Sequence, residues 1–167
     1  MIKILIADDH AVVRAGLKQI ISEISGMCVT AEATNGIEAL TKFREADFDI
    51  VILDLTMPRL GGLDVLKQLK IDNPNIPVLI LSIHSEKYYA KRVLKAGASG
   101  YLTKESAPDE LIKAIKKISG GRKYVSDSLA EVLAQDLGVE QIEQEDHHTR
   151  EQDQRLKRDL HERAHQQ

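Results

Sequence analysis

The feature that most constrains the fold of this chain is a regular alternation of short apolar runs with helical patterns. Apolar runs begin at Ile2, Met27, Ile50, Val78 and Gly100. After each run, apolar residues recur every three or four positions, which is the spacing of one face of an α-helix. Because strand and helix signals alternate five times, the sequence predicts an α/β domain with a doubly wound, five-stranded parallel sheet.

Polar residues stand where four of these runs end. The first run ends in Asp8 and Asp9, the third in Asp54 and the fourth in Ser82, while the fifth reaches Lys104. In an open parallel sheet the carboxyl ends of the strands share one edge, and ligands bind there. The sequence therefore predicts that these side chains gather into one site.

The residue types at this edge indicate phosphoryl transfer to an aspartate. Three carboxylates close together repel one another and need a cation, and Mg²⁺ binds carboxylates, phosphate oxygens and water. A carboxylate can also act as the nucleophile toward phosphorus and form an aspartyl phosphate. Such a transfer depends mainly on positioning and charge neutralisation, which Mg²⁺, Lys104 and Ser82 can supply.

Four segments, at the ends of four of the apolar runs, contain these polar residues: Ile4–His10, Leu53–Pro58, Leu81-Ser82 and Gly100–Lys104. They resemble, in order, the acidic pair, the phosphoacceptor motif, the hydroxyl residue and the aromatic and lysine segment of the receiver domain of bacterial two-component response regulators. The resemblance covers residues 2–120. The segments Leu81–His84 and Ala96–Leu102 are most similar to the NarL/FixJ subgroup. We therefore expect a receiver of that type.

The resemblance implies a flavodoxin-like, CheY-like sheet with strand order 2-1-3-4-5. It also implies that Asp54 accepts phosphate from the phosphohistidine of a sensor histidine kinase. Mg²⁺ would be held by Asp8, Asp9, Asp54 and the backbone carbonyl of Thr56. The chain would assist its own phosphotransfer and dephosphorylation and would not be an enzyme in the usual sense.

The same resemblance implies a switch. Lys104 would pair with the phosphoryl group, Ser82 would move toward it, and Tyr101 would turn inward. The surface formed by the fourth helix, the fifth strand and the fifth helix would then change and support a homodimer. Ile83 follows the switch serine where many receivers have Ala or Gly. We expect its side chain to narrow the approach of small phosphodonors or water to the site.

The chain is predicted to have three parts, namely a receiver domain (1–120), a linker helix (121–137) and a polar tail (138–167) that is helical or disordered. Residues 1–137 carry 18 basic and 18 acidic side chains, whereas residues 138–167 carry 5 and 8. An acidic tail gains little from the phosphate backbone that dominates DNA affinity. We therefore expect no specific DNA binding by this chain.

The sequence leaves two alternative functions open. A truncated DNA-binding regulator is one, because NarL/FixJ regulators usually carry a helix-turn-helix domain, yet its four helices need at least about 45 residues. A phosphatase with an aspartate nucleophile is the other. Such enzymes carry a second Asp two residues on as general acid, where this sequence has Thr56.

Composition and the N-terminus favour a cytoplasmic location. The single cysteine, Cys28, rules out an internal disulfide framework. No apolar run approaches the roughly 18 residues of a membrane span, and residues 1–7 lack the layout of a signal peptide. His10, next to the acidic pair, is interpreted as a residue at the rim of the site and not as a general base.

Overall fold

The strands form a single parallel sheet. The computed structural model describes residues 1–127 and 129–135. The sheet has the order β2-β1-β3-β4-β5, which confirms the predicted fold class and strand order. Its strands are β1 (Ile2–Ala7), β2 (Met27–Ala33), β3 (Ile50–Asp54), β4 (Val78–Ser82) and β5 (Gly100–Thr103).

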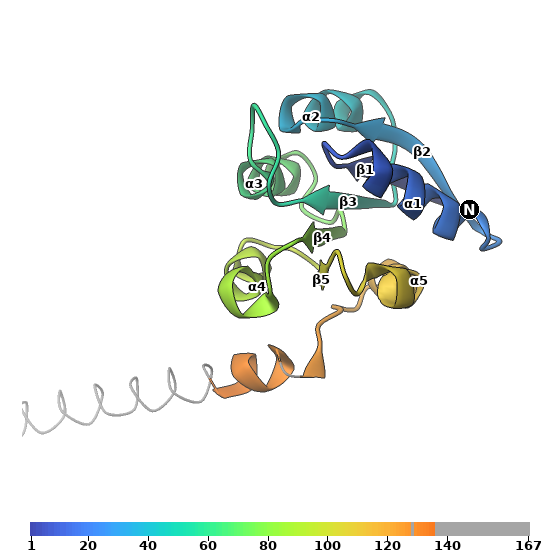
Figure 1. Cartoon of the computed structure of the whole chain (residues 1–167). Coiled ribbons are helices and arrows are strands. Elements are labelled where there is room, and N and C mark those ends of the chain that lie inside the picture. Colours follow the sequence, from blue (N-terminus) through green and yellow to red (C-terminus); the bar gives the residue numbers. More distant parts are fainter. Residues whose placement is uncertain (128, 136–167) are drawn as a thin grey trace, which may run out of the picture. The chain divides into compact units, whose positions relative to one another are not determined.

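Helices cover both faces of this sheet. They are α1 (Ala11–Ser22), α2 (Gly36–Glu45), α3 (Gly62–Asp72), α4 (Glu86–Lys95) and α5 (Ala107–Ser119). Helices α1 and α5 lie on one face, and α2, α3 and α4 lie on the other (Figure 1). Each strand is followed by a helix, which returns the chain to the end of the sheet where every strand begins. All five strands therefore end at the opposite edge.

Burial of the central strands follows from this layering. Every residue of β3 and of β4 is buried. Because successive side chains of a strand point to opposite faces, such strands must be apolar throughout. Ile50 and Ile52 pack in the core beneath α1 and α5, together with Ile4 and Ile6 of β1. The polar exceptions therefore occur where these strands end.

Local capping agrees with the sequence at one helix and differs at another. The side chain of Asn35 accepts a hydrogen bond from the backbone N–H of Glu38, as expected at the start of a helix. Ser106 directly precedes α5, but its side chain caps no backbone group of that helix. Its hydroxyl donates instead to the carbonyl of Thr103 and accepts from the Thr103 hydroxyl.

A short segment after α5 adds to the outer edge of β5. We call residues 122–126 the edge strap. Tyr124 forms a parallel bridge with Gly100, donating its N–H to Ser99 at 2.9 Å and accepting from the N–H of Tyr101 at 3.3 Å. The Tyr124 hydroxyl donates to Glu110 of α5 at 2.9 Å, and Ser126 bonds to Glu86 of α4. The strap thus ties both helices to the β5 edge.

The chain divides into a unit of residues 1–126 and a unit of residues 127–167. In the second unit, residues 127 and 129–135 are helical, within the predicted linker helix. The described residues end before the expected end of that helix and before the tail 138–167. The expected lack of DNA binding by this chain, which was inferred from the tail, therefore also lies outside them. The predicted division at residue 120 stays a prediction.

In the part of the chain that the structure describes, no helix has both the length and the apolar character to cross a membrane.

Two glycines that lie within helices, Gly62 in α3 and Gly16 in α1, have different surroundings. A Cβ on Gly62 would lie 2.3 Å from the backbone oxygen of Asp54, whereas a Cβ on Gly16 would meet nothing within 4 Å. We expect Gly62→Ala to lower the free energy of unfolding by about 1–3 kcal/mol, because backbone atoms must shift. Gly16→Ala should raise it by about 0.5–1 kcal/mol.

Urea unfolding of the two variants beside the parent protein measures both effects. Equal stability of Gly62→Ala and the parent would contradict the close approach of α3 to the end of β3.

Candidate functional site at the carboxyl edge of the sheet

The strand register brings the predicted side chains together. Asp54 is the last residue of β3 and Ser82 the last of β4, while Asp8 follows β1 and Lys104 follows β5. A backbone hydrogen bond joins the ends of β4 and β5, because the N–H of Lys104 donates to the carbonyl of Ser82 at 2.8 Å. The residues that the sequence placed at strand ends therefore share one edge of the sheet.

Lys104 is the positive charge at the centre of this site. Its Nζ lies 2.8 Å from Oδ2 of Asp8 and 3.2 Å from Oδ2 of Asp54. Asp8 is 1% exposed and Asp54 is 3% exposed. The two contacts are ion pairs, because among the described residues neither Oδ2 accepts a hydrogen bond of normal geometry. Two buried carboxylates thus depend on one ammonium group for their charge balance.

This environment changes the acidity of both partners. Burial, followed by the nearby charge of Asp8, raises the pKa of Asp54 to about 6, although Lys104 and the N–H of Thr56 act in the opposite direction. Burial alone would lower the pKa of Lys104. The close contact with the Asp8 carboxylate and the charges of Asp54 and Asp8 together outweigh that effect and raise the pKa of Lys104. Lys104 therefore stays positively charged.

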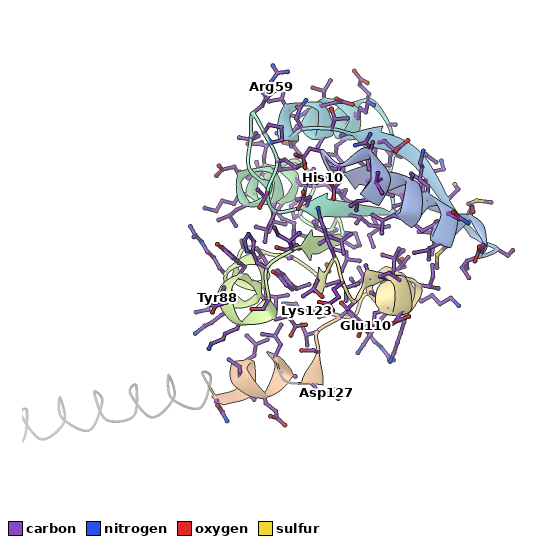
Figure 2. The ribbon with its side chains drawn as sticks, in the orientation of Figure 1. His10, Arg59, Tyr88, Glu110, Lys123 and Asp127 are labelled. Atoms are coloured by element: carbon purple, nitrogen blue, oxygen red, sulfur yellow. The ribbon has the colours of Figure 1, made fainter. Side chains whose placement is uncertain are left out.

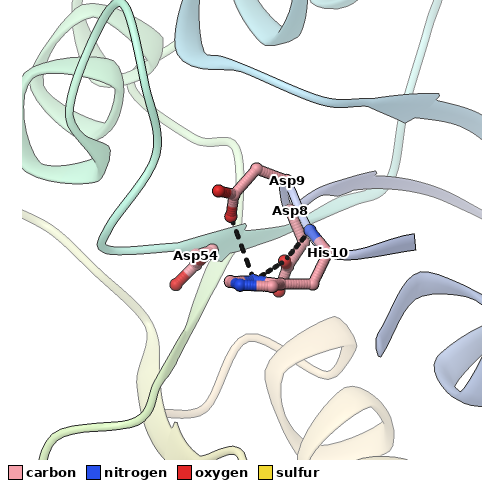
Figure 3. Close-up of side chains that lie close together, drawn as sticks. All are labelled: Asp8, Asp9, His10 and Asp54. Atoms are coloured by element: carbon pink, nitrogen blue, oxygen red, sulfur yellow. Dashed lines mark hydrogen bonds and ion pairs between the residues drawn. The ribbon is translucent and has the colours of Figure 1, made fainter. Parts of the chain in front are cut away.

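Asp9 and His10 complete an acidic cluster at the rim (Figure 3). Nδ1 of His10 lies 3.2 Å from Oδ1 of Asp8 and 3.1 Å from Oδ1 of Asp9. One possible ligand atom from each of Asp8, Asp9, His10 and Asp54 lies within 4.8 Å of the others. Three carboxylates against one lysine, with two buried oxygens that accept no hydrogen bond, form a donor set that fits a divalent cation.

Arg14 supports the site and was missed by the sequence reasoning. Its guanidinium donates to the backbone carbonyl of Asp8 at 2.7 Å and forms an ion pair with Glu32 of β2 at 3.2 Å. Asp8 also accepts a hydrogen bond from the backbone N–H of His10 at 2.8 Å. The only sequence signal was the place of a cation one helical turn after His10. These contacts fix the backbone that carries the acidic pair.

The proposed switch residues lie on the β4–β5 side of the site. The hydroxyl of Ser82 accepts a hydrogen bond from the backbone N–H of His84 at 3.0 Å. The ring of Tyr101 is fully buried, and its hydroxyl donates to the carbonyl of His84 at 2.8 Å. Both side chains therefore bond to the same residue of the β4–α4 loop. Ile83 in that loop is 71% exposed.

The backbone N–H of Thr56 donates to Oδ1 of Asp54 at 3.3 Å. This contact sets the direction of the Asp54 carboxylate from the loop that follows β3. Thr56 is itself exposed, so the site is open to solvent on this side.

The family follows from a match over most of the chain. The family described as "Response regulator receiver domain" matches residues 4–116. This chain is a member of that family. The receiver is 35% identical to the response regulator UvrY of Escherichia coli K12 over 145 residues, which is 87% of this chain and 65% of UvrY. It is 37% identical to the response regulator GacA of Pseudomonas syringae over 134 residues, 80% of this chain and 63% of GacA. The receiver thus spans just under two thirds of the length of these relatives.

Solved receiver structures have the same fold. A two-component response regulator of the LuxR family from Aurantimonas sp. SI85-9A1 matches with a TM-score of 0.74 and 37% identity, over 80% of this chain and 96% of the other. The isolated REC domain of RcsB from Salmonella enterica serovar Typhimurium, in the presence of phosphomimetic BeF3-, matches with a TM-score of 0.71 and 25% identity, over 78% and 96%.

The raised pKa of Asp54 predicts a pH-dependent stability effect. Asp54 ionises near pH 3.8 when unfolded and near pH 6 when folded, so its contribution to stability is lost as the pH rises from about 4 through 6. In EDTA, Asp54→Asn should therefore be more stable than the parent at pH 8. At about 1.4 kcal/mol per pKa unit, the gain should be about 2–3 kcal/mol and should vanish near pH 4.

Urea unfolding at several pH values measures this difference. Asp47→Asn, a change at an exposed carboxylate, is the matched control and should show no such trend. A pH-independent gain at Asp54 would contradict a folded pKa near 6.

Proposed function

We propose that this receiver accepts a phosphoryl group on Asp54 from the phosphohistidine of a sensor histidine kinase, with Mg²⁺ bound. The observation that carries the proposal is the contact of one ammonium group, that of Lys104, with the two buried carboxylates Asp8 and Asp54. An ion-paired cluster of this kind at the open edge of a sheet has a net negative charge, which a cation and a phosphoryl group together can balance.

In the proposed transfer, a carboxylate oxygen of Asp54 attacks phosphorus, an O–P bond forms and the N–P bond of the donor breaks. The electron pair of that bond goes to the imidazole nitrogen of the kinase. The N–H of Thr56 orients Asp54 through Oδ1, and Lys104 is placed to pair with the transferred oxygens. These roles correspond to positioning and neutralisation, the two demands of phosphoryl transfer.

Asp8, Asp9, Asp54 and the carbonyl of Thr56 are the proposed Mg²⁺ ligands. When bound, Mg²⁺ supplies charge neutralisation for phosphoryl oxygens. Asp8 and Asp54 are buried, whereas Asp9 is 31% exposed at the rim. Asp9 is therefore the carboxylate that solvent and an incoming ion reach most readily.

Asp54 is predicted to be the single site of phosphorylation. With Mg²⁺ and acetyl phosphate, or with a cognate kinase, the intact mass should increase by one phosphoryl group. Asp54→Asn should abolish the adduct, because an amide oxygen is a poor nucleophile toward phosphorus. Asp9→Asn should remove the dependence on Mg²⁺, since one fewer carboxylate holds the ion.

Asp47→Asn is the control, and its adduct should equal that of the parent. An undiminished adduct in Asp54→Asn would assign the phosphoryl group to another residue. Unaltered Mg²⁺ dependence in Asp9→Asn would remove Asp9 from the ligand set.

We further propose that phosphorylation changes the surface of α4, β5 and α5 through Ser82 and Tyr101. Both residues bond to His84, so a movement of the Ser82 hydroxyl toward a phosphoryl group would break its bond to the loop that precedes α4. The ring of Tyr101 already lies inward. The loop and α4 are therefore the elements that respond to such a movement.

This surface is the proposed homodimer interface. Tyr88 projects from α4 and is 71% exposed (Figure 2). Structures of RcsB, which is 25% identical to this chain, include one described as two RcsB dimers bound to two parallel DNAs. An exposed aromatic side chain is a common anchor in protein interfaces.

Phosphorylation is predicted to promote dimerisation through this surface. Sedimentation velocity with beryllofluoride should show a shift from monomer to dimer, and Tyr88→Ala should weaken it. Val12→Ala, at an 86% exposed position on α1, is the matched control and should dimerise like the parent. Loss of the dimer in Val12→Ala but not in Tyr88→Ala would place the interface on α1.

A further inference from the structure

The imidazole of His10 lies among the carboxylates at the rim of the site and not apart from them. Its Nδ1 is 3.2 Å from Asp8 Oδ1 and 3.1 Å from Asp9 Oδ1. Figure 3 shows the ring lying across the acidic pair on the side that faces Asp54. Nitrogen and oxygen donors from four residues therefore converge within 4.8 Å.

The spacing of these atoms suits a single metal ion. Nitrogen and carboxylate ligands bind Zn²⁺ at about 2.1 Å, so neighbouring ligand atoms lie about 3.0 Å apart at right angles and about 3.4 Å apart in a tetrahedron. The two observed separations of His10 Nδ1 from carboxylate oxygens fall between these limits. Little movement of the three side chains would be needed to bind one ion.

The main chain around His10 is held in place while its ring lies largely exposed at the surface. The backbone N–H of His10 donates to Asp8 at 2.8 Å, and its carbonyl accepts from the N–H of Arg14 at 3.1 Å. The imidazole itself is 62% exposed. The ring can therefore present a lone pair to an ion without disturbing the packing of the core.

The buried oxygens at the floor of the cluster provide a separate indication of a cation. Asp8 and Asp54 are 1% and 3% exposed, and the Oδ2 atom of each accepts no hydrogen bond from the described residues. Lys104 supplies one positive charge to the cluster. Two buried carboxylates share this one ammonium group, so a net negative charge remains. Because buried net charge is costly, a divalent ion would stabilise the cluster, whichever ligands complete its shell at the rim.

We propose that His10 makes this a mixed nitrogen and oxygen site, which binds borderline transition-metal ions such as Co²⁺ and Zn²⁺ with the imidazole as a direct ligand, in competition with Mg²⁺. The inference rests on the proposed function only in using the same acidic cluster. Oxygen ligands alone suit Mg²⁺, whereas imidazole favours the transition ions. His10 is thus a residue that determines which metal the receiver binds.

Calorimetric titration of the full chain with Co²⁺ and with Mg²⁺ tests this inference. His10→Gln keeps an N–H donor for Asp8 and Asp9 but lacks the imidazole ligand. We expect His10→Gln to weaken Co²⁺ binding by about tenfold or more and to change Mg²⁺ binding by less than about twofold, because Mg²⁺ takes oxygen ligands.

The double variant His161→Ala, His165→Ala is the matched control, because it removes two histidines that lie four positions apart in the sequence and that the inference does not use. It should keep the ratio of Co²⁺ to Mg²⁺ affinity. With one equivalent of Co²⁺, a paramagnetically shifted imidazole N–H proton signal should be present in the parent and this control and absent in His10→Gln.

Equal losses of Co²⁺ and Mg²⁺ affinity in His10→Gln, or no loss of either, would overturn the inference. The outcome is separable from phosphorylation. If His10-dependent Co²⁺ binding is seen and Asp54 takes no phosphoryl group, the proposed function fails and the inference stands. If Asp54 is phosphorylated and His10→Gln keeps the metal preference, the inference fails alone.

Discussion

The structure depends on the burial of two carboxylates against one ammonium group. Asp8 and Asp54 are buried because Asp8 directly follows β1 and Asp54 ends β3, two strands covered by helices on both faces. Lys104, from the end of β5, reaches both of them. Burial, followed by the nearby charge of Asp8, raises the pKa of Asp54, so the fold gives up stability at this edge. A cation and a phosphoryl group bound as proposed would offset that cost by balancing the negative charge.

The sequence predicted the parts of the site that follow from topology. In a parallel sheet all carboxyl ends lie at one edge, so the ends of the apolar runs were enough to bring Asp8, Asp54, Ser82 and Lys104 together. Ser106 stands just before α5, where a serine commonly caps a helix, yet its side chain makes no such bond. A capping signal in the sequence depends only on local spacing. Here the Ser106 hydroxyl bonds instead to Thr103 at the end of β5, donating to its carbonyl and accepting from its hydroxyl.

Other contacts could not be predicted because no periodic pattern carries them. Arg14 reaches back to the carbonyl of Asp8, and Tyr124 adds to β5 from beyond α5. Both depend on how distant segments are placed by the packed sheet. The orientation of His10 is a similar case. Its neighbours in the sequence showed that it lies at the rim, but the direction of its ring depends on the turn that Asp8 forms with the backbone of His10.

The edge strap has a consequence for self-association of the sheet. An outer strand with free N–H and C=O groups is a template for pairing with another chain, which leads to aggregation. Tyr124 occupies such groups at Ser99 and Tyr101, and its approach leaves no room for a Cβ on Gly100, which would lie 2.8 Å from the Tyr124 carbonyl. A chain shortened at the end of α5 would keep every residue of the acidic edge. It would nevertheless expose unpaired backbone N–H and C=O groups along β5. The strap therefore blocks this part of the edge of β5 from pairing with another chain.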